Sequence, residues 1–319
     1  MEDKVLLEVK GLKKYFSMGH KQDLKAVDDI SFYVKKGETL GVVGESGSGK
    51  TTCGRCIAGL NHITAGEVIY DGKNIKKLRG KEKKRFHKEV QTIFQDPYSS
   101  LDPKMKVQDI ISEGMVIHKL YENNEERLKA VYELMELVGL SAKQGVRYAH
   151  EFSGGQRQRI GIARALAVEP KLIICDEPIS ALDVSIQAQI INLLMDLQEK
   201  MGLTYLFIAH DLSVVRHIST RIIVMYLGKI MEISTADELY EKPLHPYTQV
   251  LISSIPIPDP KVEREREKLE LEGEVSKVVG NDQGCRFKDR CRYAREVCSK
   301  EAPELREVAD NHFVACHLC

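Results

Sequence analysis

A glycine-rich run near the N-terminus has the residue types needed to bind a polyphosphate. It reads GESGSGKTT from position 44 and fits the pattern G-x-x-x-x-G-K-[ST]. Glycines let the backbone wrap around phosphates with its N–H groups pointing inward, and a following helix adds partial positive charge. Lys50 would reach the β- and γ-phosphates, and the Thr51 hydroxyl would ligate Mg²⁺. The predicted nucleotide ligands are Gly44, Ser46, Gly47, Ser48, Gly49, Lys50, Thr51 and Thr52.

Two adjacent carboxylates follow a short apolar segment further along the chain. Asp176 and Glu177 come directly after the run at 171–175 and precede Pro178. Side chains at the carboxyl end of a parallel strand face the ligand crevice, so Asp176 could hold Mg²⁺ and Glu177 could polarise an attacking water. Adjacent strand residues point in opposite directions, so this division of roles requires a turn directly after the strand. By itself such a pair is more typical of a charged surface, and the phosphate loop favours the catalytic interpretation.

A third motif, SGGQ, opens a segment that we expect to be helical as far as about residue 168. Ser153 stands where a helix N-cap belongs, and Gly154 and Gly155 would leave exposed N–H groups for an anion. Gln156 completes the motif. A chain with two such anion sites and one metal-binding carboxylate pair suggests a dimer.

The segments that would position these motifs alternate between strand-like and helix-like patterns. Strands are expected at 39–43, 171–175, 204–208 and 221–225, with an amphipathic helix at 184–201. This order is typical of an α/β domain with a mainly parallel sheet. Residues 107–139 read instead as consecutive helices without a strand, which predicts an all-helical insertion.

A change in composition near residue 240 predicts a domain boundary. Closely spaced prolines follow it, and they are incompatible with a regular helix or a central strand. We therefore divide the chain into an ATPase domain at 1–240 and an extension at 241–319.

Charge and hydropathy restrict where the protein works. Lys and Arg number 47, as do Asp and Glu, so no overall charge draws the chain to nucleic acid or anionic lipid. The basic stretch 76–85 has no interleaved aromatic residues and is interrupted by Glu82, which favours a solvated helix face. No signal-peptide pattern and no apolar run of ~18 residues occurs. We expect a cytosolic chain that meets a membrane only through a partner.

Cysteines crowd the end of the chain. In a reducing compartment such a group indicates metal ligands before disulfides. Four thiolates suit a structural zinc or an iron–sulfur cluster, and free thiols or a disulfide are further alternatives. Only the spacing at 316–319 has the C-x-x-C form usual for zinc. The crowded cysteines are Cys285, Cys291, Cys298, Cys316 and Cys319.

The order of these motifs resembles the ATPase subunits of ABC transporters. The resemblance implies a P-loop NTPase fold with a RecA-like core, an antiparallel β subdomain and a helical subdomain at about 96–160. It also implies two ATPase domains that pair head to tail, so that SGGQ of one completes the nucleotide site of the other. Four further roles follow from the resemblance alone: Gln95 contacts Mg²⁺ and the attacking water, His210 senses the γ-phosphate, Asp183 reaches across the dimer, and Phe16 stacks on adenine, with Tyr15 as its competitor.

Longer strings narrow the resemblance to the dipeptide and oligopeptide importers. Among them are FQDPYSSLDPKM, ALDVSIQAQI, HPYTQVLISSIPIPDP and GCRFKDRCRYA. The match indicates an F-type subunit in preference to a D-type one, with ATP and Mg²⁺ as cofactors. Its implied partners are a second ATPase subunit, identical or different, two integral membrane permease subunits and, indirectly, an extracytoplasmic peptide-binding protein. The chain would lie at the cytoplasmic side of the cell membrane.

Two other functions stay open. Related importers for nickel or glutathione share most of these strings, and a non-transport ABC ATPase is the competing class. For the cysteines, the resemblance favours a 4Fe–4S cluster on Cys285, Cys291, Cys298 and Cys316, with Cys319 as an extra residue.

Overall fold

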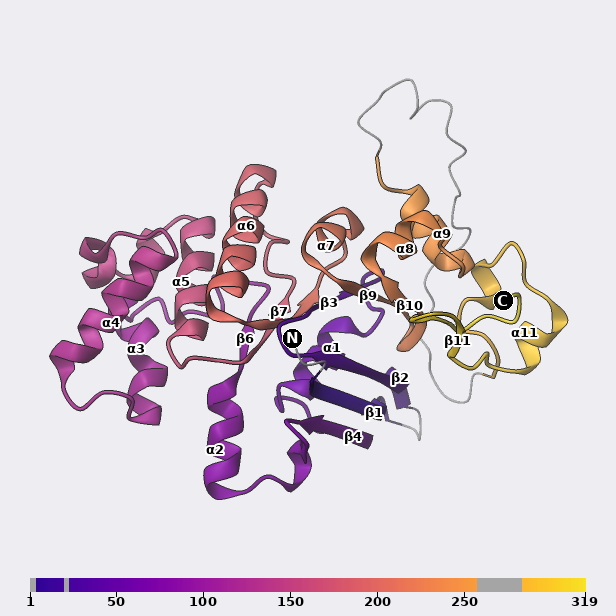
Figure 1. The fold of residues 1–319 in the computed structure, drawn as a ribbon, viewed down its shortest axis with the longest axis horizontal. Coiled ribbons are helices and arrows are strands. Elements are labelled where there is room, and N and C mark those ends of the chain that lie inside the picture. Colours follow the sequence, from indigo (N-terminus) through magenta and orange to yellow (C-terminus); the bar gives the residue numbers. More distant parts are fainter. Residues whose placement is uncertain (1–3, 20–22, 257–282) are drawn as a thin grey trace. The chain divides into compact units, whose positions relative to one another are not determined.

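The computed structural model describes residues 4–19, 23–256 and 283–319 (Figure 1). These residues fall into two compact units. The described part of the first unit comprises residues 4–6, Val34–Glu38 and Tyr70–Ile208. The second takes its described residues from Leu7–Tyr33, Thr39–Ile69 and Ala209–Cys319. The phosphate loop thus belongs to the second unit, whereas the carboxylate pair and SGGQ belong to the first.

The first unit contains three neighbouring parallel strands whose order is β8, β7, β6. All residues of β7 and β8 are buried, which explains their nearly continuous apolar sequences. In register, Ile93 lies opposite Cys175, and Asp176 lies opposite Ile208. The strands of this unit are β5 (Lys73–Asn74), β6 (Val90–Ile93), β7 (Leu172–Asp176) and β8 (Thr204–Ile208).

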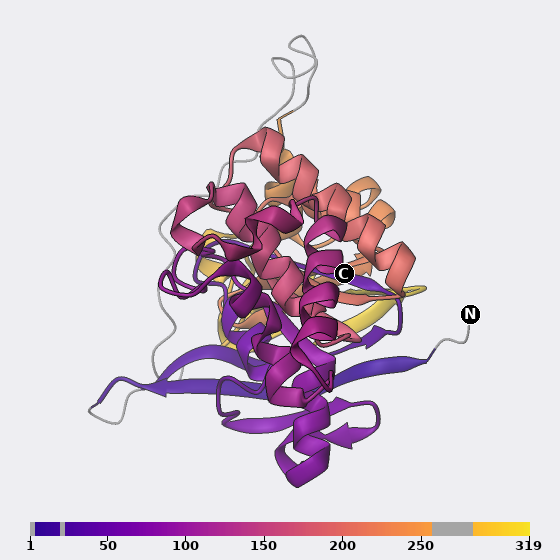
Figure 2. The same cartoon turned by 90° about the vertical axis from the view of Figure 1, so that its left-hand side faces the viewer.

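Helices make up most of the rest of the first unit. The expected helical block is present as α3 and α4, and α3 packs against both α4 and α5 (Figure 2). Asn123 caps α4 through its side chain, which accepts a hydrogen bond from the N–H of Glu126. The helices are α2 (Gly80–Glu89), α3 (Val107–His118), α4 (Asn124–Leu137), α5 (Gly154–Leu166) and α6 (Val184–Met201).

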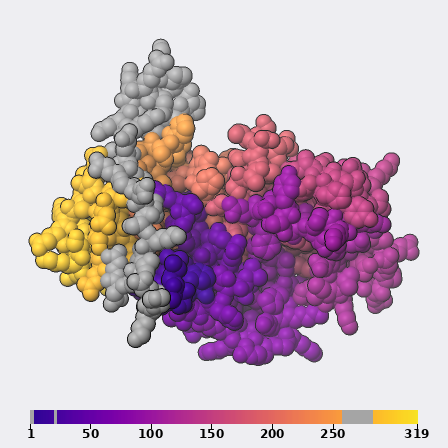
Figure 3. Space-filling view, turned by 180° about the vertical axis from the view of Figure 1, so that it is seen from behind, coloured from indigo at the N-terminus to yellow at the C-terminus, as the bar shows by residue number. Residues whose placement is uncertain are grey.

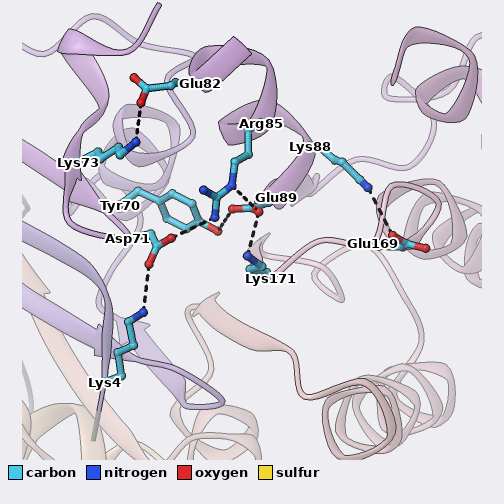
Figure 4. A network of polar contacts seen from close by, with 10 residues as sticks. All are labelled: Lys4, Tyr70, Asp71, Lys73, Glu82, Arg85, Lys88, Glu89, Glu169 and Lys171. Carbon is cyan, nitrogen blue, oxygen red and sulfur yellow. Dashed lines mark hydrogen bonds and ion pairs between the residues drawn. The ribbon is translucent and has the colours of Figure 1, made fainter. Parts of the chain in front are cut away.

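A buried carboxylate fixes the start of β7 to the end of α2 (Figure 4). Glu89 accepts hydrogen bonds from Arg85 at 2.8 Å, Lys171 at 2.9 Å and the Tyr70 hydroxyl at 3.1 Å. Burial alone would raise the pKa of Glu89, but the bonds from Arg85 and Lys171 lower it below its usual value. The ionised carboxylate therefore anchors the strand whose far end carries Asp176.

The second unit has two groups of strands. In one, β1 lies between β2 and β4. In the other, β3 pairs in parallel with β9, β10 pairs antiparallel with β9, and the chain ends in an antiparallel pair of β11 and β12. The strands are β1 (Val5–Ser17, from Leu7 onward in this unit), β2 (Asp23–Lys35, to Tyr33), β3 (Thr39–Val43), β4 (Ala65–Tyr70, to Ile69), β9 (Arg221–Tyr226), β10 (Lys229–Thr235), β11 (Arg306–Ala309) and β12 (His312–Val314).

Short helices complete the second unit. Helix α1 follows the phosphate loop, and the others lie at and after the end of the predicted ATPase domain, apart from α7. Their bounds are α1 (Lys50–Ile57), α7 (Leu212–Ile218), α8 (Ala236–Glu241), α9 (Pro246–Ser253) and α11 (Glu296–Lys300). In the part of the chain that the structure describes, no helix has the length and apolarity that a bilayer crossing requires.

The extension continues the sheet of the second unit. Strand β12 pairs with β10, with Val314 opposite Glu232. The buried His312 ring contacts Glu232 at 2.7 Å, and the same carboxylate accepts the N–H groups of Leu244 and His245. These bonds join strands on both sides of the predicted boundary at about residue 240, which stays a prediction. Residues 257–282 of the predicted extension lie outside the described part.

Candidate active site

The predicted phosphate loop connects β3 to α1 in the second unit. Gly49 is the helix N-cap with φ 100°, and a Cβ there would meet the carbonyl oxygen of Ala26 at 2.2 Å, so only glycine fits. No side-chain hydrogen bond from Gly49 caps α1, and a helix start that follows a glycine-rich loop is a common binding place for an anion. Thr51 and Thr52 are half-buried in the first turn, while Ser46 and Gly47 are exposed.

The loop lysine bonds within its own loop. Lys50 is 4% exposed, and its Nζ donates to the carbonyl oxygens of Gly44 at 2.7 Å and Glu45 at 3.0 Å. A longer bond of 3.3 Å reaches the hydroxyl of Ser48. The carbonyls of the loop thus hold the ammonium group beside the start of α1, where a polyphosphate would add further negative charge.

The carboxylates after β7 have the turn that their separate roles require. Asp176 is the last residue of the strand and is 2% exposed. Glu177 has φ 48°, a conformation that L residues rarely adopt and that is found at functional sites. Its N–H donates to the carbonyl oxygen of Ile208 at 2.9 Å, which fixes the turn to the end of β8. The backbone therefore changes direction between Asp176, which ends the strand, and the half-buried Glu177, which lies in the turn.

Gln95 and Glu177 meet although 82 positions separate them. The Gln95 Nε2 donates to a carboxylate oxygen of Glu177 at 2.8 Å. Gln95 follows β6 and Glu177 follows β7, and these parallel strands are neighbours, so both side chains emerge at the same sheet edge. The amide can thereby orient the carboxylate toward a water molecule.

The SGGQ motif begins α5 as expected. The Ser153 hydroxyl accepts the N–H of Gln156 at 3.4 Å, and the Gln156 side chain accepts the N–H of Ser153 at 3.1 Å. A Cβ on Gly155 would meet Ile186 Cγ2 at 2.6 Å, whereas one on Gly154 would meet nothing closer than 3.4 Å. Gly155 is thus required by packing against α6, and Ser153 remains exposed.

The other predicted residues lie at element ends or on an exposed strand face. Asp183 is the exposed N-cap of α6, and its side chain makes no capping bond. His210 is exposed in the second unit just before α7. Phe16 is 39% exposed on β1, whereas the Tyr15 hydroxyl is hydrogen-bonded to Asp28. The bonded hydroxyl restrains the Tyr15 ring, so Phe16 is the better candidate for stacking on a base.

Sequence reasoning missed an aromatic residue beside SGGQ. The Arg157 guanidinium lies 3.9 Å from the centroid of the Tyr98 ring, and Tyr98 is 58% exposed. Arg157 also donates to the carbonyls of Ala149 and His150, which holds it in place. In the sequence, this contact could have been suspected because Tyr98 follows Gln95 by three residues and Arg157 directly follows SGGQ.

The four cysteines of the predicted cluster lie in the second unit and share one type of local bond. Backbone N–H groups donate to the sulfurs of Cys298 and Cys316 at 3.5 Å each. Burial raises the pKa of Cys285 to about 11 and also raises that of Cys291, while N–H bonds from Phe287 and Tyr293 oppose the rise. The neighbouring cysteines add to both rises, because a thiol is harder to ionise beside other thiols.

The thiols are nevertheless not grouped tightly enough for one ion. Among residues 4–19, 23–256 and 283–319, no three His, Cys, Asp or Glu side chains are placed to hold a metal ion together. The described residues therefore do not support a metal centre at these cysteines, and the 4Fe–4S cluster stays a prediction.

Family models match both parts of the chain. The ABC transporter model matches residues 27–180, and the model for the C-terminal region of oligopeptide/dipeptide transporters matches residues 231–298. The oligopeptide transport ATP-binding protein OppF of Streptococcus mutans is 59% identical over 98% of this chain and 94% of its own. OppF of Bacillus subtilis is 54% identical over 98% of this chain and 96% of its own.

Solved structures of ATP-binding cassettes share the fold. A dimeric post-hydrolysis state of the cassette MJ0796, bound to ADP and phosphate, has a TM-score of 0.65 and 29% identity. It covers 72% of this chain and 99% of its own. CbiO1 of Clostridium perfringens, part of the ABC transporter complex CbiONQ, has a TM-score of 0.66 and 27% identity, covering 75% and 91%. The matches account for the motif order and for the sheet arrangement of each unit.

Proposed function

We propose that this chain couples ATP hydrolysis to the import of oligopeptides, because it belongs to the ATP-binding proteins of oligopeptide ABC transporters. The observation that carries the catalytic part is the 2.8 Å bond from Gln95 to Glu177 at the turn after β7. This bond joins a water-orienting amide to a carboxylate that can act as a general base. Because the chain turns at Glu177, the neighbouring buried Asp176 does not share the role of base.

Each side chain has a distinct task in this proposal. The N–H groups of the phosphate loop and Lys50 would bind the polyphosphate. Thr51 and Asp176 would hold Mg²⁺, and Gln95 would add a contact; the ion's chemistry is to neutralise charge on the phosphate oxygens. Glu177 would take a proton from the attacking water. Oxygen donors such as a hydroxyl and a carboxylate are the ligands that Mg²⁺ prefers, so the residues present fit the ion.

We assign a second ATPase subunit as the partner of the SGGQ motif. The exposed Ser153 and the helix start behind it present N–H groups to an anion that this chain would share with its partner. Asp183 would reach across the same dimer, His210 would sense the γ-phosphate, and Phe16 would stack on adenine. ATP would thus hold the dimer together, and hydrolysis would release it.

The remaining partners are assigned from the relatives. Two integral membrane permease subunits would bind the ATPase dimer at the cytoplasmic side of the membrane, and a peptide-binding protein outside the membrane would deliver the cargo. The two OppF relatives favour the F-type subunit in a pair of different ATPase chains. Peptide import is preferred over nickel or glutathione import for the same reason.

We also propose that Cys285, Cys291, Cys298 and Cys316 bind a 4Fe–4S cluster. Each of the four sulfurs accepts a backbone N–H bond, and such bonds are a means by which proteins stabilise the sulfur ligands of a cluster. Cys319 donates to the carbonyl of Leu244 at 3.9 Å and stays outside the set. A bound cluster would supply a rigid link between four points of the extension.

Transport is tested by reconstituting the chain with candidate permease subunits in liposomes. ATP-dependent uptake of labelled tri- and tetrapeptides is expected, with nickel and glutathione as competing cargoes. Glu177→Gln should abolish uptake, while Glu199→Gln, at an exposed position on α6, should leave it unchanged. Uptake of nickel or glutathione without peptide uptake would overturn the cargo assignment.

The cluster is tested separately by anaerobic purification. Iron and acid-labile sulfide in equal amounts, with absorbance in the visible range, are expected in the unaltered chain and in Cys319→Ser. Cys298→Ser should lose both. A preparation with zinc, or without iron and sulfide after reconstitution, would overturn the assignment.

A further inference from the structure

The Cys-rich extension contacts the phosphate loop directly, and both belong to the second unit. Arg290 Nη1 lies 2.8 Å from the carboxylate of Glu45, the second residue of the loop motif. The two residues are 245 positions apart. Their side chains are 9% and 23% exposed, so the pair is largely withdrawn from water. Such a pair is screened by salt less than a surface pair is.

Glu45 is held at three of its groups. Its carboxylate binds Arg290, its N–H donates to the Tyr247 hydroxyl at 2.9 Å, and its carbonyl accepts from Lys50 at 3.0 Å. The first two bonds come from residues beyond position 240. The extension and α9 therefore determine the placement of a residue inside the nucleotide-binding loop.

Aromatic packing fixes the segment that carries Arg290. This segment runs from Cys285 to Cys291 and includes the short 3₁₀ turn Lys288–Arg290. Phe287 is 1% exposed, and its ring centroid lies 5.3 Å from those of Tyr226 and Tyr247. Arg290 also donates to the Tyr226 hydroxyl at 3.3 Å. The guanidinium is thus held in one place opposite the loop.

A second arginine of the same segment is paired near β1. Arg286 binds Asp28 at 2.8 Å, with side-chain exposures of 5% and 11%. Asp28 also accepts the Tyr15 hydroxyl, next to the predicted adenine-stacking Phe16. Burial would raise the pKa of Asp28, but the bonds from Tyr15 and Arg286 and the charge of Lys229 lower it. Asp28 is consequently ionised and keeps the segment attached to the unit. Figure 3 shows residues 283–319, which include this segment, in yellow at the surface.

The charge of Glu45 makes this attachment matter for binding. A carboxylate in a phosphate loop repels a polyphosphate, and the repulsion is strong where water is partly excluded. Arg290 is the partner that balances this carboxylate in the structure. Removing it would leave a partly buried, uncompensated negative charge in the loop.

We propose that Arg290 is a positioning residue of the nucleotide site: it neutralises and holds Glu45, so that the phosphate loop accepts ATP only while the Cys285–Cys291 segment is in place. The extension then acts on nucleotide affinity through one ion pair. This inference rests on the assignment of the loop to nucleotide binding.

The test measures the Kd for ATP with Mg²⁺ by calorimetry in a Glu177→Gln background, which prevents turnover. Arg290→Met keeps an unbranched side chain but removes the charge, and we expect about fivefold to tenfold weaker binding, the lower range of coupling between sites. Adding Glu45→Gln should restore the affinity, because the repelling charge is gone. Arg292→Ala, at an exposed position of the same extension, is the matched control and should not change Kd.

Two further readouts separate this role from a purely structural one. The loss in Arg290→Met should shrink between about 0.05 and 0.5 M salt and be smaller for ADP, which carries less charge. Should Arg290→Met fail to fold, Glu45→Gln alone is expected to bind ATP more tightly, because Arg290 is then unbalanced. An unchanged Kd in Arg290→Met, or no recovery with Glu45→Gln, would overturn the inference.

Lys50→Ala distinguishes the two levels of the proposal. If it leaves ATP binding intact, the loop assignment itself fails. If it abolishes binding while Arg290→Met binds ATP normally, the loop assignment stands and only the inference about Arg290 is wrong.

Discussion

At the end of β7, Glu177 is turned by its own backbone, whereas Glu45 in the phosphate loop is held by side chains from far down the chain. The turn at Glu177 depends on a positive φ and on one bond to the adjacent strand β8. Glu45 depends on Tyr247 and Arg290, which follow it by 202 and 245 positions. The direction of a side chain depends on the dihedral angles of its own backbone. The charge of a loop residue is neutralised only when the fold brings an opposite charge close to it. The backbone turn at Glu177 is thus a feature of one residue and its neighbouring strand, whereas Glu45 is positioned by residues more than 200 positions away.

The largest expected effect is at the locally built site. Glu177→Gln should lower ATP turnover by about 10²- to 10⁴-fold, because the amide cannot accept the proton of the attacking water. ATP binding should persist, and the dimer should accumulate in size-exclusion chromatography. Turnover at the normal rate would contradict the assignment of Glu177 as the base.

The attachment of the extension should be sensitive to pH on both sides of about 6.5. Burial lowers the pKa of His245 to about 4, so the unfolded chain binds a proton that the folded chain refuses, and stability falls as pH drops from 6.5 toward 4. At about 1.4 kcal/mol per pKa unit, the loss amounts to about 3 kcal/mol. The hydrogen bond to Glu232 raises the pKa of His312, so its stabilisation is lost as pH rises through that raised value.

The unfolding temperature measured between pH 4 and 9 checks both the acid limb and the alkaline limb of the stability profile. His245→Asn keeps a side chain that can cap α9, and it should flatten the acid limb alone. His312→Gln should flatten the alkaline limb alone. A stability profile unchanged by either substitution would show that these buried groups do not titrate on unfolding.

Packing of the SGGQ helix in the first unit should give a smaller effect. Gly155→Ala brings a Cβ within 2.6 Å of Ile186, and we expect a loss of about 1 to 3 kcal/mol in the free energy of unfolding. Gly154→Ala is the control, since its nearest contact is an ordinary 3.4 Å. Urea titration measures both, and Ile186→Ala should relieve the first. Equal stability of the two alanine variants would refute the packing requirement.

We expect the smallest loss in the free energy of unfolding from removing a helix cap in either unit. Ser153→Ala and Thr235→Ala each remove a side-chain cap of 3.4 Å, from α5 and α8 respectively. Each should cost about 1 kcal/mol. If the units unfold together, one urea transition shifts equally in both variants, and two separate transitions would show that the units unfold independently.

Much of the site was predictable because its signals are local. The phosphate loop, the strand before Asp176 and the capped start of α5 each lie within fewer than a dozen residues, and helix 184–201 has the predicted bounds. The predicted strand ends agree with the observed ones to within one residue. The roles of His210, Asp183 and Phe16 came from the resemblance and stay predictions.

The tertiary structure decided which side chains that are far apart in the sequence come into contact. Sequence spacing could not show that Gln95 bonds Glu177, that Tyr98 lies under Arg157 or that Arg290 balances Glu45. These partners are brought together by strand pairing and by the docking of the extension on β10. Local sequence determined which chemistry each segment of this protein can perform, because dihedral preferences and caps act over a few residues. Which charges face one another was settled only by folding, because electrostatic partners depend on distance in space and not on distance along the chain.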